Sequence, residues 1–299
     1  MRLPARTKSI FPALCLIAAM LILFALAPRS GGSFSVAAKP QNTTFSAAAE
    51  GDISPAAGVS LLPFASALLP ISAYRIEPET DFAAYCEAGA EVMRTLALYP
   101  DGFFETLSGY VGGIVIELCG GIRSGGSMPD RPAAVTADCL SFRLIALETD
   151  PQTIGPALMH ELCHVIDCCL DSASIGDPSR WNDEAWGALN PKDFRYYSTY
   201  DPAVYESGET KYAAEAPFDP EDVYFINRYA MTYPTEDRAV AFETMMRLSP
   251  GAECMKSPHI RAKLAYYFAA IRYYLDPGGT WSTPSFWEKA FSGSGQSGI

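Results

Sequence analysis

The clearest chemistry in the sequence lies in the five residues His160-Glu161-Leu162-Cys163-His164. On a helix, residues four apart lie one turn apart on the same face, so the two imidazoles can bind one metal ion. Glu161 falls at the edge of that face, where a carboxylate can reach a water on the metal without ligating it. This HExxH spacing is typical of zinc hydrolases. We therefore predict His160 and His164 as zinc ligands and Glu161 as the general base.

A catalytic zinc keeps three protein ligands and one open position, so a third ligand must lie elsewhere. The extended pattern HExxHxxGxxH is not completed, because position 167 is Asp rather than Gly. His259, the one other histidine of the chain, has no supporting motif. Glu184 and Glu236 remain as candidates. Glu184 lies 20 residues after His164, the spacing of thermolysin-like peptidases, but lacks the aspartate which that family places four residues later.

Glu236 lies in the segment YAMTYPTEDRA, which spans residues 229–239. Pro234 is expected to break the preceding structure, and Thr235 can cap a helix that carries Glu236 and Asp237 in its first turn. A helix that begins there could run beside the HExxH helix. On the residues alone, Glu184 and Glu236 both remain open as the third ligand.

Two motifs, HELCHVID and YAMTYPTEDRA, resemble the anthrax lethal factor-like zinc metallopeptidases. They resemble more closely a group of bacterial zinc-binding metallopeptidases with the segment Tyr-Ala-x-Thr-x-Pro-x-Glu-Asp-x-Ala. The resemblance covers about Leu147 to Arg247 and implies that Glu236 ligates zinc and that Tyr229 points at the substrate carbonyl. Many members have another glutamate four residues after the ligand. Here that position is Val240, so its role is absent or has moved, with Glu243 as the candidate.

The HExxH helix must be buried on one side to hold its ligands. An apolar stripe predicts that burial, and it consists of Ile154, Leu158, Leu162, Val165 and Ile166. Thr153 can cap the helix, with Pro156 in its first turn. Asp167, on the polar side, can orient an imidazole, anchor the neighbouring wall, or simply be solvated.

The remaining pattern predicts an α+β fold. The expected elements are a helix over Asp81–Leu98, strands over Gly109–Cys119 and Ala133–Leu147, an irregular cleft wall over Asp171–Pro220, and a last helix over Pro258–Leu275. Beyond Pro277 the tail is expected to fray. With the resemblance, this indicates a zincin-like catalytic domain with a small mixed sheet, an HExxH active-site helix and a helical C-terminal part. An edge strand of such a sheet can hold a substrate backbone.

The N-terminus has the layout of an export signal. Arg2, Arg6 and Lys8 precede an apolar run from Ile10 to Ala27. We expect residues 1–38 to be a signal peptide or an N-terminal membrane anchor, residues 39–72 a flexible Ala/Ser/Pro-rich tether, and residues 73–299 the metallopeptidase-like domain. The domain is then extracellular or at the cell surface, and the membrane is a partner only through the N-terminal segment.

The net charge bears on the possible partners, and the cysteines bear on the possible kinds of metal site. A net charge of −12 argues against nucleic acid as a partner. Cys15 lies in the apolar run, so the other seven cysteines belong to the part of the chain that we expect to be exported. Because no CxxC pair occurs, we expect structural disulfides rather than a cysteine zinc site, with the pairing left open.

Two functions remain. The first is an exported, monomeric zinc metallopeptidase with one Zn²⁺ per chain, which hydrolyses a peptide or protein substrate. The alternative is a non-catalytic exported metal-binding or adhesion protein, whose zinc would be closed by a fourth side chain. Cys163 is expected to face away from the histidines, and Cys168 lies a turn beyond His164. Glu161 favours the enzyme, because a structural zinc site does not require a general base.

Overall fold

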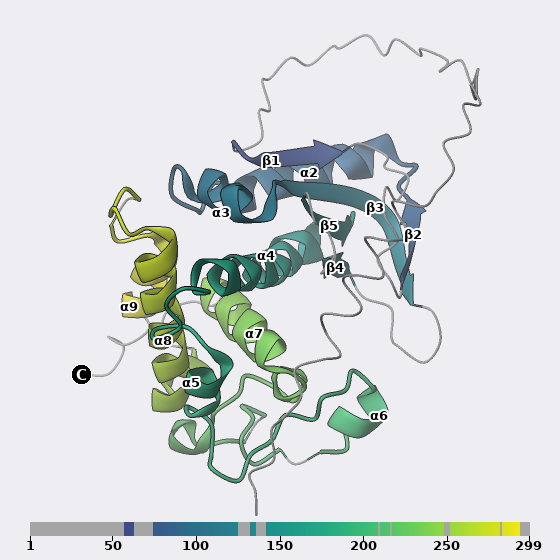
Figure 1. The fold of residues 1–299 in the computed structure, drawn as a ribbon. Helices are drawn as coiled ribbons and strands as arrows, with labels where there is room; N and C mark the ends of the chain where they lie inside the picture. The colour runs from purple at the N-terminus through teal and green to yellow at the C-terminus, as the bar shows by residue number, and fades with distance from the viewer. Residues whose placement is uncertain are drawn as a thin grey trace, which may run out of the picture. The chain divides into compact units, whose positions relative to one another are not determined.

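A long helix, α4 (Pro151–Ala173), lies between a mixed sheet and the C-terminal helices (Figure 1). It carries the HExxH residues in its middle. Leu158, Leu162 and Ile166 are fully buried, as the apolar stripe predicted. Because α4 packs against the strands on one side and against α7 (Pro234–Arg247) and α8 (Pro258–Leu275) on the other, its histidines are held in a rigid setting.

The start of α4 differs from the expectation. Asp150 is the N-cap and accepts a hydrogen bond from the backbone N–H of Gln152, so the prediction of Thr153 as the cap is wrong. An aspartate in extended conformation directly before a proline is a better cap than a threonine already inside the first turn. Pro156 was expected in the first turn, but α4 begins at Pro151, so Pro156 lies beyond the first turn, inside the helix.

The computed structural model describes residues 57–62, 74–124, 132–135, 142–208, 210–215, 217–247, 252–281 and 283–293. All of them belong to one unit, Ile53–Ile299. The predicted signal or anchor over residues 1–38 lies outside the described residues, as does most of the predicted tether. Within the described ranges, no helix combines the length and the apolar character needed to cross a lipid bilayer.

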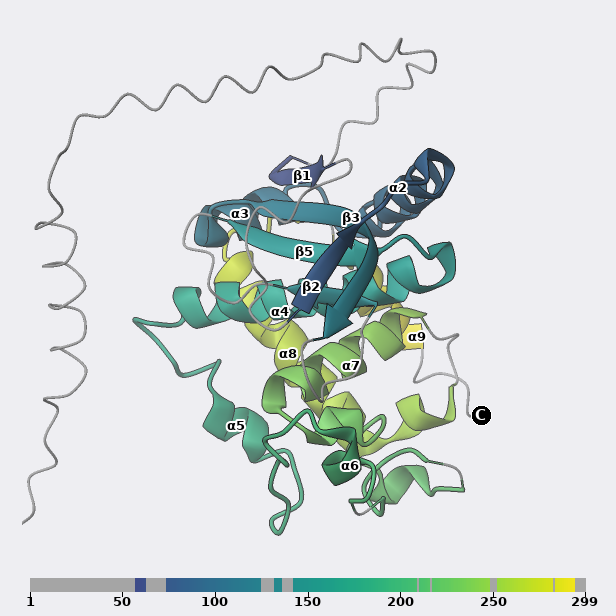
Figure 2. The ribbon, with the colours of Figure 1, turned by 90° about the vertical axis from the view of Figure 1, so that its right-hand side faces the viewer.

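The sheet has five strands, and both parallel and antiparallel pairs occur (Figure 2). They are β1 (Val59–Leu62), β2 (Tyr74–Pro78), β3 (Ile114–Ser124), β4 (Ala133–Val135) and β5 (Arg143–Glu148). β3 is central: it pairs in parallel with β1 and β5 and antiparallel with β2. β4 pairs antiparallel with β5 and ends the order β1-β3-β5-β4. The expected small mixed sheet is therefore confirmed.

Several expected boundaries are corrected. Gly109–Val111 ends a helix rather than starting a strand, and the segment Ala133–Leu147 holds two strands, β4 and β5, instead of one. β1 lies inside the segment expected to be a flexible tether. Four residues, three of them apolar, suffice for β1 because β3 supplies its hydrogen-bond partners, which composition alone does not reveal.

The other regular elements of the described chain are helices. Those not yet given are α2 (Phe82–Leu96), α3 (Phe103–Val111), α5 (Asp183–Gly187), α6 (Pro202–Tyr205) and α9 (Phe286–Gly293). Three short 3₁₀ turns are η1 (Pro220–Asp222), η2 (Tyr229–Met231) and η3 (Glu253–Lys256). α2 and α8 confirm the predicted helices, and the helical C-terminal part is present.

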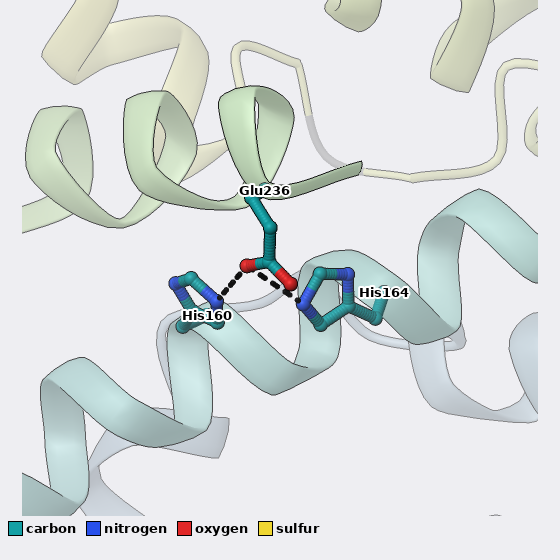
Figure 3. Close-up of side chains that lie close together, drawn as sticks. All are labelled: His160, His164 and Glu236. Atoms are coloured by element: carbon teal, nitrogen blue, oxygen red, sulfur yellow. Dashed lines mark hydrogen bonds and ion pairs between the residues drawn. The ribbon is translucent and has the colours of Figure 1, made fainter. Parts of the chain in front are cut away.

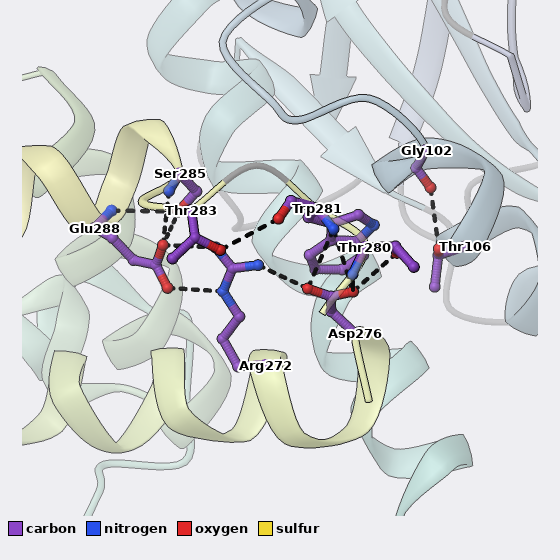
Figure 4. A network of polar contacts seen from close by, with 9 residues as sticks. All are labelled: Gly102, Thr106, Arg272, Asp276, Thr280, Trp281, Thr283, Ser285 and Glu288. Atoms are coloured by element: carbon purple, nitrogen blue, oxygen red, sulfur yellow. Dashed lines mark hydrogen bonds and ion pairs between the residues drawn. The ribbon is translucent and has the colours of Figure 1, made fainter. Parts of the chain in front are cut away.

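The helix α9 corrects the expectation of a fraying tail. Arg272 on α8 donates to both carboxylate oxygens of Glu288 on α9, at 2.7 and 2.6 Å, and also reaches Asp276 at 2.8 Å (Figure 4). Trp287 is fully buried in the core beside Phe103. The buried Trp287 ring and the ion pairs of Arg272 therefore hold α9 in place. The Gly/Ser-rich composition of this part of the chain did not indicate a helix.

The expectation of structural disulfides is wrong for the described cysteines. These six are free thiols: Cys86, Cys119, Cys163, Cys168, Cys169 and Cys254. Cys139 lies outside the described residues. Cys163 is fully buried with its sulfur 3.0 Å from the hydroxyl of Tyr267, and burial raises its pKa well above the usual range. Such a thiol fills the core as a small apolar group.

Candidate metal centre

His160 and His164 lie on one face of α4, one turn apart. Their ring centroids are 5.0 Å apart and the rings are tilted by 79°. Each side chain is only about one-seventh exposed, 14% for His160 and 16% for His164. Glu236, on the first turn of α7, points between the two rings (Figure 3).

The Oε2 atom of Glu236 is 3.0 Å from Nε2 of His160 and 3.6 Å from Nε2 of His164. One ligand atom from each of the three residues lies within 4.8 Å of the others. Two ligand atoms bound about 2.1 Å from one tetrahedral ion are about 3.4 Å apart. The three side chains therefore fit a single zinc ion, and two imidazoles with one carboxylate are a donor set that zinc accepts.

The first helical residue of α7 is Pro234, so Thr235 lies inside the helix and is not its cap. Proline is favoured at that position because it has no N–H to leave unbonded. The acidic residues Glu236 and Asp237 then occupy the first turn, where the helix dipole favours negative charge.

Two further side chains contact the ligands. Glu243, two turns along α7, places Oε2 3.3 Å from Nδ1 of His160. The hydroxyl of Tyr200 donates to Oε1 of Glu236 at 2.9 Å. Glu243 also accepts a bond of 2.7 Å from Arg247, which holds its carboxylate in place. A carboxylate on the far nitrogen of a ligating histidine fixes the tautomer and the ring orientation.

The side chains of this group shift one another's pKa values. Burial lowers the pKa of His160, but hydrogen bonds with Glu236 and Glu243 and the charge of Glu161 outweigh it and raise the pKa to about 10. Burial raises the pKa of Glu236, whereas the charge of His164 and the hydrogen bonds of both imidazoles hold it well below its usual range. The carboxylate is therefore ionised, as a metal ligand must be.

A cavity of about 490 Å³ opens beside His160. Its wall includes His160, Glu161 and Tyr229, together with Pro132 and Ala133 at β4 and the α7 residues Val240, Glu243, Thr244 and Arg247. The ring centroid of Tyr229 is 6.3 Å from that of His160. Glu161, the predicted base, and Tyr229 thus line the same cavity as His160.

Buried charges fix α7 against its neighbours. The carboxylate of Asp167 on α4 accepts a bond of 2.7 Å from Nε of Arg238. The Oδ2 atom of Asp237 accepts bonds of 2.8 Å from both Lys263 on α8 and Tyr196. In α7, Glu236 thus contacts the histidines, Asp237 contacts α8, and Arg238 contacts α4. Of the roles considered for Asp167, its position matches the anchoring of a neighbouring wall.

The other candidates lie apart from this group. Glu184 is exposed on the short helix α5. His259 stacks on Tyr224, with ring centroids 3.7 Å apart, and its Nε2 contacts the carbonyl of Glu221. Among the described residues, the group that could share one metal ion contains neither of them, and no cysteine.

The sequence did not identify Tyr200 as a residue of the site. It belongs to the segment Asp171–Pro220, which holds many aromatic residues without a clear period. Nothing in the sequence separates Tyr200 from Tyr196, Tyr197 or Tyr205. Its contact with Glu236 depends on the path of the loop and becomes visible only in the fold.

Comparisons with known proteins give little more. No protein-family model and no curated protein sequence matches the chain. The solved structure of a "putative zinc-binding metallo-peptidase" from Bacteroides caccae is similar to it, with a TM-score of 0.42 and 14% sequence identity. The similarity covers 79% of this chain and 85% of that chain. A likeness at this level does not establish a function for this chain.

Proposed function

We propose that this protein is a zinc-dependent metallopeptidase whose metal ion is held by His160, His164 and Glu236. One observation supports it above all: three ligand atoms lie within 4.8 Å of one another, and Glu161 lines the cavity next to them. A closed structural site would carry a fourth ligand from the protein. Here the described residues supply three, which leaves one position for water or substrate.

Zinc bound there would lower the pKa of a water molecule and polarise a carbonyl group. Glu161 accepts a proton from the attacking water, whose oxygen forms the new bond to the carbonyl carbon. The same carboxylate then returns the proton to the leaving amine nitrogen as the C–N bond breaks. Tyr229 donates a hydrogen bond to the carbonyl oxygen as it gains negative charge, an interaction worth about 3 kcal/mol where such donors have been removed.

The edge of the sheet can hold the peptide. β4 is the last strand in the order β1-β3-β5-β4 and pairs with β5 alone among the described strands. Ala133, its first residue, lines the cavity with Pro132. An extended substrate that adds to this edge would run past His160 and Glu161 with its backbone amides paired.

The ligands and the base all come from one chain, so the site is complete in a monomer. We further propose that the protein works outside the cell or at its surface, as the N-terminal charge and hydropathy pattern indicates. Its substrate is then an extracellular peptide or protein.

A library of quenched fluorescent peptides tests this function with the full chain. Wild-type protein loaded with zinc should cleave a subset of the library, and a chelator should stop cleavage. Glu161→Gln should retain zinc and lose cleavage. Zinc binding without cleavage of any peptide by wild type would support the non-catalytic alternative instead.

A further inference from the structure

Tyr200 contacts the metal-binding carboxylate from behind. Its hydroxyl donates to Oε1 of Glu236 at 2.9 Å, while the other oxygen, Oε2, faces both histidines. The Glu236 side chain is only 4% exposed, so water has little access to Oε1. The two oxygens of one carboxylate therefore have separate partners.

A carboxylate can bind a metal through one oxygen or through both. Binding through both would take up the position that water or substrate needs. We propose that Tyr200 is a positioning residue that keeps Glu236 a one-oxygen ligand and so preserves the open coordination position. This inference rests on the metal site of the proposed function and adds a residue that the HExxH pattern does not contain.

The loop that carries Tyr200 is fixed at the start of α7. The backbone N–H groups of Tyr197 and Ser198 donate to the carbonyl oxygens of Met231 and Thr232, at 3.0 and 2.9 Å. Ser198 has a φ of 55°, in the left-handed region that is unfavourable for a residue with a side chain. The fold holds this conformation two residues before Tyr200, which directs the chain back toward Glu236.

Ring packing holds the phenol as well. The Tyr200 ring lies 4.6 Å from the ring of Tyr233 and 6.3 Å from that of Tyr229, measured between centroids. Tyr233 is the residue directly before α7. Because these contacts involve the ring and not the hydroxyl, Tyr200→Phe keeps the ring packing and removes the hydrogen bond to Glu236.

The first test is zinc affinity, measured on the full chain by competition with a chromophoric chelator. Wild type should bind one zinc per chain. Tyr200→Phe should still bind one, with affinity lower by about 10- to 100-fold, the usual effect of losing a partner of a ligand. Tyr233→Phe removes a hydroxyl from the adjacent ring and should stay within twofold of wild type.

The second test is the visible spectrum of the cobalt-substituted protein. If Glu236 of Tyr200→Phe turns to bind through both oxygens, the five-coordinate cobalt should absorb more weakly than the four-coordinate wild type. Loss of packing alone would lower the melting temperature of the metal-free variant without this spectral change. Wild-type affinity and spectrum in Tyr200→Phe would overturn the role of Tyr200 alone. Failure of wild type to bind zinc would overturn the metal site itself, and the inference with it.

Discussion

Asp167 on α4 and Arg238 on α7 form a buried ion pair, with 2.7 Å between Oδ2 and Nε and side chains that are 5% and 3% exposed. Asp167 lies three residues after His164, and Arg238 lies two residues after Glu236. The ion pair therefore joins the two ligand-bearing helices just beyond the ligands. Burial raises the pKa of Asp167 despite the opposing charge of Arg238, which shows how strongly this carboxylate is desolvated.

Breaking this pair should destabilise the whole domain. Arg238→Met leaves the carboxylate of Asp167 buried without its cation, and we expect the free energy of unfolding to fall by about 3–5 kcal/mol. Urea unfolding of the metal-free protein measures it. Arg75→Met, which breaks an exposed pair with Glu77, should cost about 1 kcal/mol or less. Equal losses in the two variants would mean that the buried pair has no special role.

Glu243 should set zinc affinity through the orientation of His160. Glu243→Gln weakens the acceptor facing Nδ1 at 3.3 Å, so we expect zinc to bind about 10- to 100-fold more weakly, with the stoichiometry unchanged. Glu253→Gln, on the exposed pair with Lys256, is the matched control and should bind as wild type does. Normal zinc binding by Glu243→Gln would contradict this role of Glu243.

The attachment of α9 should depend on pH through Glu288. Hydrogen bonds from Arg272 are the largest cause that lowers the pKa of Glu288, to about 2. A carboxyl whose pKa is lowered by folding stabilises the fold above its unfolded pKa, near 4.5, and loses this contribution as pH falls toward 2. At pH 6 we expect Glu288→Gln to melt about 2–4 °C below wild type, an effect of about 1 kcal/mol.

The difference between Glu288→Gln and wild type should shrink steadily as pH is lowered from 4.5 toward 2. Melting temperatures recorded by circular dichroism at several pH values measure it. A difference that stays constant over this range would show that the charge of Glu288 is not what fixes α9.

Long periodic elements could be predicted from the sequence. The stripe through Leu158 and Leu162 indicated α4, and α8 was predicted at Pro258–Leu275, where it lies in the structure. These elements have strong local signals, because helix periodicity and capping are encoded within a few residues. The ligand candidates followed from the fixed HExxH spacing and from the first turn of α7.

The parts that failed depend on contacts between distant segments. β1 is only four residues long and needs β3 to be a strand, and α9 needs Arg272 and the core around Phe103. Tyr200 contacts Glu236, which lies 36 residues later in the chain. No local pattern encodes such contacts. The cysteine count suggested disulfides because composition does not show which thiols the fold keeps apart.

Glu161 should act in catalysis without holding the metal. It lines the cavity beside His160 but does not belong to the group of three ligand atoms. Glu161→Gln should lower kcat by at least about 100-fold, the smaller end of general-base effects, and leave zinc content at one per chain. Activity near wild type in this variant would remove Glu161 from the mechanism. Loss of zinc would instead make it a ligand.

The most direct measurement is zinc content per chain in purified wild type, Glu236→Ala and Glu184→Ala. We predict one zinc in wild type and in Glu184→Ala, and zinc lost or much weakened in Glu236→Ala. Loss in Glu184→Ala alone would move the third ligand to α5 and contradict the site built from α4 and α7. Wild-type protein that takes up no zinc, even when zinc is added back, would contradict the metallopeptidase assignment altogether.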